Sequence, residues 1–198
     1  MGERGVRIVA GEWRGRRIVS PKGERTRPTQ DRVREALFSA LTSQMGPGIA
    51  EAEVLDAFAG SGALGLEALS RGASRAVFVE QDHDARRALE ANVSALGAER
   101  RARIVAGDAF TLARRRALPG GPFGLILLDP PYRIEAARVG VLLDDLVAAG
   151  AASGGATVVW EHAGDAPAAW PEGFEVHSTK RYGSTTIDIA RIRMGRHA

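Results

Sequence analysis

The stretch DAFAGSGALG, residues 56–65, lies between a short apolar run and a segment whose apolar residues have helical spacing. Gly60, Gly62 and Gly65 fit the pattern G-x-G-x-x-G at the junction of a predicted strand and a predicted helix. Glycines at such a junction let the backbone turn tightly and approach a ligand closely. Ordinary strand–helix turns show the same pattern, so its meaning depends on the residues around it.

Apolar runs and helical patterns alternate along the rest of the chain. Strands are expected in AEVLDAF, RAVFVE, ARIVAGDA, FGLILLD and ATVVWEH, and a closing pair of strands in FEVHSTKRYGSTTIDIARIRM. Helices are expected between them in GALGLEALSRG, DHDARRALEANVSALG and RVGVLLDDLVAAG. This alternation predicts an α/β fold with a mostly parallel sheet covered on both faces, to which the last pair adds an antiparallel edge.

The N-terminal part of the chain differs from this body in charge. Residues 1–34 carry ten Arg or Lys residues and four acids, a net charge of +6, whereas the remaining 164 residues carry −3. β-Prone runs around the turn GEWRG predict a hairpin, and Thr29 is expected to cap the helix that follows. We expect a basic hairpin extension over residues 1–27 and the main domain over 28–198. The charge suggests a polyanionic partner, although a solvated basic tail would have the same composition.

Carboxylates follow the strands predicted after the glycine stretch. Glu80 ends the next strand, where an acid commonly binds ribose hydroxyls, and Asp108 follows the third strand, where it could accept from an adenine amino group. Parallel strands place these groups at one edge of the sheet, so an adenosine-type ligand is expected there. Asp56 would repel a pyrophosphate but could pair with the ammonium of a methionine moiety, which favours S-adenosylmethionine over a dinucleotide. The expected cofactor-binding residues are Asp56, Phe58, Gly60, Gly62, Glu80, Asp108 and Ala109.

The run LILLDPPYR, residues 125–133, ends the fourth predicted strand at the same edge. Two prolines hold the backbone extended, which fixes the Asp129 carboxylate and the Pro130 carbonyl as acceptors. Such acceptors could bind the N–H groups of an exocyclic amine and aim its lone pair at a sulfonium methyl, while Tyr132 stacks on the base. A plain strand-end turn is the alternative, but the register after the cofactor residues favours chemistry. The expected catalytic residues are Asp129, Pro130, Pro131 and Tyr132.

These motifs resemble those of class I methyltransferases, and DPPY resembles the motif of their branch that acts on amino groups of nucleic acids. Together with RIVAGEWRGRRI at 7–18, RPTQDRVREALF at 27–38 and KRYGST at 180–185, the chain is similar to the RsmD family of bacterial 16S ribosomal RNA guanine-N2 methyltransferases. The resemblance implies a Rossmann-like, seven-stranded sheet with an antiparallel last strand. It implies methyl transfer from S-adenosylmethionine to the N2 amine of a guanine in 16S rRNA, within the small subunit or its assembly intermediate.

The resemblance also gives the basic hairpin a function. Its arginines could contact RNA phosphates, and Trp13 could stack on a base or pack on the body. Arg27, Thr29 and Arg32 could touch either the cofactor carboxylate or the RNA. The expected RNA-binding residues are Arg7, Trp13, Arg14, Arg16, Arg17 and Arg27.

Two other functions stay open on the sequence. A DNA adenine-N6 methyltransferase can use the same tetrapeptide, although the chain has no obvious target-recognition domain. A non-catalytic assembly factor that binds S-adenosylmethionine and RNA would have no need of DPPY. The chain has no cysteine and its four histidines lack ligand spacing, so no metal site is expected. No run is apolar enough to span a bilayer and the basic start lacks the apolar core of a secretory signal, so a cytoplasmic protein is expected.

Overall fold

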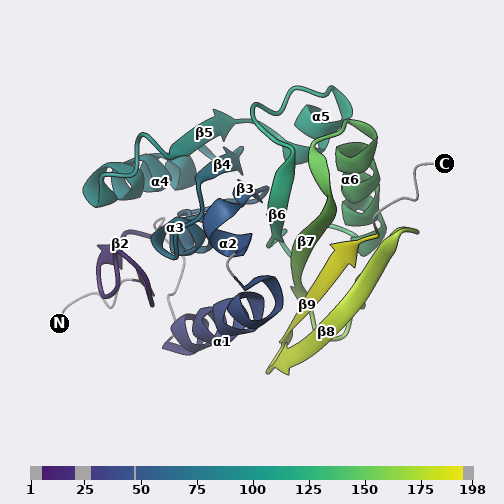
Figure 1. Ribbon diagram of the computed structural model, residues 1–198, viewed down its shortest axis with the longest axis horizontal. Coiled ribbons are helices and arrows are strands. Elements are labelled where there is room, and N and C mark those ends of the chain that lie inside the picture. Colours follow the sequence, from purple (N-terminus) through teal and green to yellow (C-terminus); the bar gives the residue numbers. More distant parts are fainter. Residues whose placement is uncertain (1–5, 21–27, 47, 194–198) are drawn as a thin grey trace.

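A computed structural model describes residues 6–20, 28–46 and 48–193. Its main sheet has seven strands in the order β5-β4-β3-β6-β7-β9-β8 (Figure 1). They are β3 Glu53–Asp56, β4 Arg75–Glu80, β5 Ala102–Ala106, β6 Phe123–Leu128, β7 Ala152–Ala163, β8 Phe174–Tyr182 and β9 Thr185–Ile192. β3 to β7 pair in parallel, and β9 lies antiparallel between β7 and β8. The predicted parallel sheet with an antiparallel last strand is confirmed, with β8 rather than β9 at the edge.

Helices cover both faces of this sheet (Figure 1). One face carries α1 Pro28–Met45, α2 Gly48–Glu51, α3 Ala63–Ser70 and α4 His83–Leu96, and the other carries α5 Ala109–Arg114 and α6 Ala136–Ala148. In β6, Leu125 and Leu127 pack in the first layer, and Ile126 and Leu128 pack in the second. Because both faces are buried, the strand is apolar without alternation. In the described part of the chain, no helix is long and apolar enough to cross a membrane.

Two features of the helices differ from the sequence prediction. The pattern did not predict α2 or α5, because helices of four and six residues are too short to show a period. α1 begins at Pro28, so Thr29 is the second residue of the helix and not its cap. Proline suits the first helical position, where its missing N–H would have no partner inside the helix.

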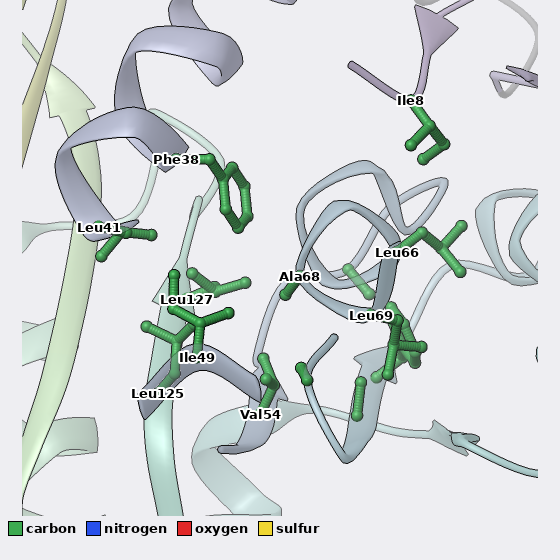
Figure 2. Close-up of a cluster of buried hydrophobic side chains, with 14 of the residues drawn as sticks. Ile8, Phe38, Leu41, Ile49, Val54, Leu66, Ala68, Leu69, Leu125 and Leu127 are labelled. Atoms are coloured by element: carbon green, nitrogen blue, oxygen red, sulfur yellow. The ribbon is translucent and has the colours of Figure 1, made fainter. Parts of the chain in front are cut away.

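The N-terminal hairpin is confirmed, with paired strands of two residues each, β1 Val6–Arg7 and β2 Arg17–Ile18. Its apolar side chains belong to the core cluster of α1, α3 and α4, so the hairpin and the sheet share one core. Figure 2 shows Ile8 of the hairpin above Leu66 and Leu69 of α3. The buried hairpin residues are Val6, Ile8, Trp13 and Ile18. The predicted boundary lies between residues 27 and 28; residues 21–27 on its N-terminal side lie outside the described residues.

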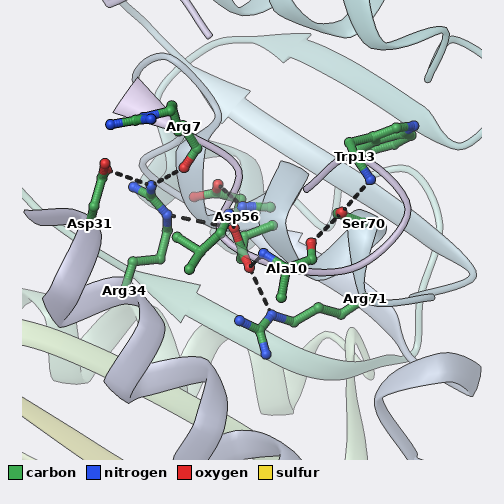
Figure 3. A network of polar contacts seen from close by, with 11 residues as sticks. Arg7, Ala10, Trp13, Asp31, Arg34, Asp56, Ser70 and Arg71 are labelled. Carbon is green, nitrogen blue, oxygen red and sulfur yellow. Dashed lines mark hydrogen bonds and ion pairs between the residues drawn. The ribbon is translucent and has the colours of Figure 1, made fainter. Parts of the chain in front are cut away.

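A buried carboxylate on α3 holds the hairpin in place (Figure 3). Glu67, with an exposed fraction of 0%, accepts hydrogen bonds from the Val9 N–H at 2.7 Å and the Ala10 N–H at 3.1 Å. Arg71 Nε lies 2.8 Å from Glu67 Oε1, and Arg34 Nε lies 3.7 Å from Oε2. Two guanidinium groups and two amides therefore compensate the burial of one negative charge.

The turn of the hairpin packs closely on the end of α3. The Trp13 N–H donates to Ser70 Oγ at 3.0 Å, and the Ser70 hydroxyl donates to the Ala10 carbonyl at 2.6 Å (Figure 3). A Cβ on Gly11 would lie 1.8 Å from the Ser70 carbonyl oxygen, and Gly11 has φ of +82°. Only glycine allows this approach and this backbone conformation together.

We expect Glu67→Ala to lower the free energy of unfolding by about 3–5 kcal/mol, because it removes the partner of the buried Arg34 and the half-buried Arg71 and the acceptor of two amides. Urea denaturation measures the change. Glu99 is exposed, so Glu99→Ala serves as the control and should stay within about 0.5 kcal/mol of the parent. A Glu67→Ala protein as stable as this control would show that the buried network does not hold the hairpin.

Candidate functional site

Four acids predicted to share a sheet edge do so in the structure. Asp56 and Glu80 end β3 and β4, Asp108 follows β5 by two residues, and Asp129 directly follows β6. These four strands are parallel and adjacent, so their carboxyl ends meet at one edge. Among the expected cofactor residues, those buried are Asp56, Gly62 and Ala109, and those half-buried are Phe58, Gly60, Glu80 and Asp108.

Glu80 organises the loop between β3 and α3. Its Oε2 accepts a hydrogen bond from the Gly60 N–H at 2.7 Å, and its Oε1 accepts from the Asp82 N–H at 2.7 Å. A carboxylate has about four lone-pair sites, so both oxygens can still accept from a ligand hydroxyl. Glu80 therefore links the glycine loop to the end of the neighbouring strand and keeps the capacity to bind a diol.

The three glycines of the motif serve different purposes. A Cβ on Gly62 would lie 2.4 Å from Leu89 Cδ1, and a Cβ on Gly65 would lie 2.3 Å from Phe78 Cε1. Close packing of α3 on α4 and β4 thus accounts for these two glycines. Gly60 has φ of +52°, and a Cβ there would meet no atom within 4 Å. Gly60 is thus the motif glycine that borders open space, and a contact of Gly62 with a ligand stays a prediction.

Asp56 is enclosed by protein, with an exposed fraction of 1%. Its Oδ2 accepts a hydrogen bond from the Gly65 N–H at 3.0 Å, in the first turn of α3, while Oδ1 meets no donor among the described residues. Burial raises the pKa of Asp56 to about 7; Glu80 acts in the same direction, and the backbone N–H groups of Gly65 and Phe58 oppose it. Asp56 therefore satisfies the start of α3, and its predicted pairing with an ammonium stays a prediction.

The unpredicted helix α5 adds aromatic groups to this edge. Asp108 caps α5, since its Oδ1 accepts from the Thr111 N–H at 2.7 Å. The helix places Phe110 against Phe58, with 5.7 Å between the ring centroids. The Arg138 guanidinium of α6 lies 4.1 Å from the Phe110 centroid. Phe110 and Arg138 were not among the predicted site residues. Asp108 is a residue type that favours the N-cap position, and this was the one signal in the sequence for α5.

The segment after β6 presents its aromatic ring to solvent. Pro130 is buried, whereas Asp129 and Pro131 are exposed. Tyr132 has an exposed fraction of 63%, and its hydroxyl lies 3.0 Å from Thr185 Oγ1 at the start of β9. The ring is thus tethered at its tip while its surface stays open, which suits stacking on a planar base.

The arginines of the hairpin are exposed, but they are not equivalent. Arg7, Arg14 and Arg17 face solvent, and Arg7 and Arg14 line a hollow shared with Arg32 of α1. The Arg16 guanidinium donates to the Ala95 carbonyl near the end of α4, so it also ties the hairpin to the body. Arg27 lies outside the described residues.

Trp13 packs on the body, one of the two roles that the sequence left open. Its exposed fraction is 4%, and the Arg101 guanidinium lies 4.9 Å from the ring centroid. Arg101 is also paired with Glu12 at 2.6 Å, which holds it over the indole. The ring face is therefore covered, and a base cannot stack on it in this conformation.

Asn92 of α4 connects the hairpin to the glycine loop. Its side-chain amide donates to the Val19 carbonyl at 2.8 Å and to the Ser61 carbonyl at 2.9 Å, and its Oδ1 accepts from the Val19 N–H at 2.7 Å. With an exposed fraction of 1%, Asn92 lies inside the protein. The side chain of Asn92 thus holds the hairpin at Val19 and the glycine loop at Ser61.

A family model described as "Conserved hypothetical protein 95" matches residues 6–191. The "Ribosomal RNA small subunit methyltransferase D" of Escherichia coli is 44% identical over 128 residues, 65% of this chain and 61% of that protein. The protein of the same name from Haemophilus influenzae is 38% identical over 138 residues, 70% of this chain and 69% of that protein. The chain belongs to this family, the RsmD family. The resemblance seen in the sequence is thereby confirmed.

A solved structure described as "Putative methyltransferase yhhF" supports the fold. The structure of yhhF from E. coli superposes with a TM-score of 0.80 at 33% sequence identity, covering 96% of this chain and 99% of that one. The Rossmann-like architecture of this chain is therefore shared with a solved methyltransferase-like structure over nearly its whole length. Within the described ranges, no three His, Asp or Glu side chains gather in a way that could hold a metal ion.

The raised pKa of Asp56 predicts how stability depends on pH. An acid that ionises near pH 3.8 when unfolded and near about 7 when folded holds its proton more tightly in the folded state. Between these values the folded state binds more protons, so the free energy of unfolding falls as pH rises. Asp56→Asn cannot ionise and keeps an acceptor for the Gly65 N–H. We expect its stability relative to the parent to improve by about 4 kcal/mol between pH 4 and pH 8.

Urea denaturation across this pH range measures the difference. Asp144 is exposed on α6, so Asp144→Asn provides the control and its curve should run parallel to that of the parent. If the parent and Asp56→Asn keep a constant difference in stability from pH 4 to pH 8, Asp56 does not carry a buried proton.

Proposed function

We propose that this RsmD-family chain transfers a methyl group from S-adenosylmethionine to the N2 amine of a guanine in 16S rRNA of the small ribosomal subunit. The observation that carries the proposal is the segment Asp129–Tyr132 at the edge that Glu80 and Asp108 share. The E. coli and H. influenzae relatives are named for methylation of small-subunit rRNA, which supports the substrate class. The matched region spans only 61% of the E. coli protein. The proposal therefore depends on the site residues of this chain as well as on that similarity.

The residues at the edge fit S-adenosylmethionine. Glu80 would accept from the ribose hydroxyls, and Asp108 keeps Oδ2 for an adenine amino group because Oδ1 caps α5. The orphaned Oδ1 of Asp56 suits a cationic group, which would also favour the ionised carboxylate. When bound, the cofactor supplies an electrophilic methyl on a sulfonium.

The residues of the DPPY segment would prepare the nucleophile. An exocyclic amine is a poor nucleophile, because its lone pair is delocalised into the base. The Asp129 carboxylate and the Pro130 carbonyl would accept its two N–H groups, favour a pyramidal nitrogen and orient the lone pair. The carboxylate also stabilises the positive charge that develops on nitrogen. The amine would lose its proton after the transfer, so no strong base is required. Tyr132 would hold the base, extruded from its stack, by its exposed ring face.

The basic hairpin would hold the RNA. Arg7, Arg14 and Arg17 are exposed on it, and the hollow beside it is lined by Arg7, Arg14 and Arg32 together with the acids Asp31 and Glu35. Phosphate contacts of this kind position the RNA without reading its sequence. The partner is 16S rRNA, either in the small subunit or in its assembly intermediate, which places the protein in the cytoplasm.

Mapping of modified nucleosides by mass spectrometry, in 16S rRNA from cells with and without the gene, tests the proposal. Loss of one N2-methylguanosine in the mutant supports it. Loss of N6-methyladenine from DNA instead, or no change in any nucleoside, would point to a DNA methyltransferase or to a non-catalytic assembly factor.

We expect Asp129→Ala to lower the single-turnover rate of methyl transfer about 10²–10³-fold, because one pre-organised acceptor is lost. The rate is measured with radiolabelled cofactor on small-subunit particles that lack the modification. Tyr132→Phe keeps the stacking face and serves as a control that should stay active. If Asp129→Ala binds both substrates normally and transfers methyl at the parental rate, the carboxylate only ends the strand.

Combined replacement of Arg7, Arg14 and Arg17 by Ala should weaken RNA binding and reduce its salt dependence by up to about three counterions. The affinity for S-adenosylhomocysteine should not change. A matched control replaces Arg75, Arg100 and Arg103, which are exposed on the body and carry the same charge. Equal salt slopes for the two triple mutants would show that the hairpin has no special part in RNA binding.

A further inference from the structure

β7 ends at the same edge as β6 and carries an acid that the mechanism proposed above does not use. In the parallel ladder between these strands, Leu128 pairs with Trp160. The next residue on each strand is Asp129 on one side and Glu161 on the other. Asp129 and Glu161 therefore occupy neighbouring positions, each one residue beyond the last pair of this ladder.

Tyr132 spans the end of β7 on the face where Glu161 lies. Glu161 pairs with Ile187 of β9, which is buried in the core cluster of α1 and α3. Thr185 lies two residues before Ile187 on the same strand, so its side chain points to the same face. The Tyr132 hydroxyl lies 3.0 Å from Thr185 Oγ1, and β7 lies between β6 and β9 in the sheet. A base that stacks on Tyr132 would therefore bring its edge to Glu161.

The carboxylate of Glu161 can accept a hydrogen bond from a ligand. It is half-buried, and no residue in the described ranges donates a hydrogen bond to it. Burial raises the pKa of Glu161, and the adjacent His162 acts in the opposite direction. A half-buried carboxylate is partly shielded from water, so a ligand that donates a hydrogen bond to it is favoured.

We propose that Glu161 selects guanine by accepting the N1–H of the base whose N2 amine is held by Asp129 and the Pro130 carbonyl. The inference rests on the proposed function. Guanine presents N1–H and N2–H side by side on its Watson–Crick edge, whereas adenine presents an unprotonated ring nitrogen at position 1. A carboxylate attracts the first arrangement and repels the second, so one residue both binds the correct base and rejects the wrong one.

A substrate pair isolates this contact. 2,6-Diaminopurine keeps the 2-amine of guanine but has an acceptor at N1. Ligation places this base, or guanine, at the target position of an RNA fragment. The target guanine is first located by nucleoside mapping. The parent should prefer guanine by about tenfold to hundredfold in kcat/KM, as expected for one lost hydrogen bond and one repulsive contact. Glu161→Gln offers an amide that can donate to N1, and it should reduce this preference by at least about tenfold.

Asp165 provides the matched control, because it is an exposed acid close to the end of β7. Asp165→Asn removes the same charge and should keep the parental ratio. Glu161→Gln should keep the parental affinity for S-adenosylhomocysteine and the parental unfolding curve. These two measurements separate base selection from a loss of structure.

The outcomes distinguish this inference from the proposed function. A parent enzyme that methylates no guanine overturns the proposed function, and this inference with it. A parent that methylates guanine and 2,6-diaminopurine equally well overturns only the role of Glu161. The same conclusion holds if Glu161→Gln loses activity on both bases in equal proportion, because the ratio would then be unchanged.

Discussion

The hydrogen bond from the Gly65 N–H to the buried carboxyl group of Asp56 fixes the start of α3, and much of the structure depends on where α3 lies. The loop that precedes the helix contains Gly60, which Glu80 holds at the sheet edge. The other end of the helix carries Glu67 and Ser70, which bind the hairpin. One short helix therefore positions the cofactor loop and the basic extension relative to the same sheet. A shift of α3 would displace both.

Carboxylates do most of this positioning, and they do it by accepting backbone N–H groups. Glu67 binds two amides of the hairpin, Glu80 binds two amides near the loop, and Asp108 binds one at the start of α5. Hydrogen bonds from amides to ionised acids are short and strong, and they hold loops that lack regular structure. Glu80 and Asp108, which lie at the sheet edge, still have lone pairs that can accept from a ligand. Structural and binding roles thus reside in the same side chains.

The sheet and the acidic edge could be predicted from the sequence because both depend on local patterns. A strand buried on both faces is a continuous apolar run in the sequence. The residue that follows such a run must therefore lie where the carboxyl ends of the parallel strands meet. Trp13 could not be assigned, because burial of its ring depends on Arg101, which is distant in the chain. Glu161 was missed since it lies inside a strand, and its relation to Tyr132 depends on the order β6-β7-β9, which no local pattern reveals. Short helices such as α5 also escape prediction, and with them residues like Phe110.

Asn92 shows how a residue remote from any reaction can be fixed by its neighbours. Its amide gives both of its donors to carbonyls on two separate segments, and its oxygen accepts from one of them. Aspartate has the shape but no donor, leucine has neither donor nor acceptor, and glutamine is longer by one methylene. Aspartate or leucine at this position would leave the Val19 and Ser61 carbonyls without the donors that Asn92 gives them. One side chain of α4 thus couples two segments that are far apart in the sequence, so a change at this position would act on the hairpin and the glycine loop together.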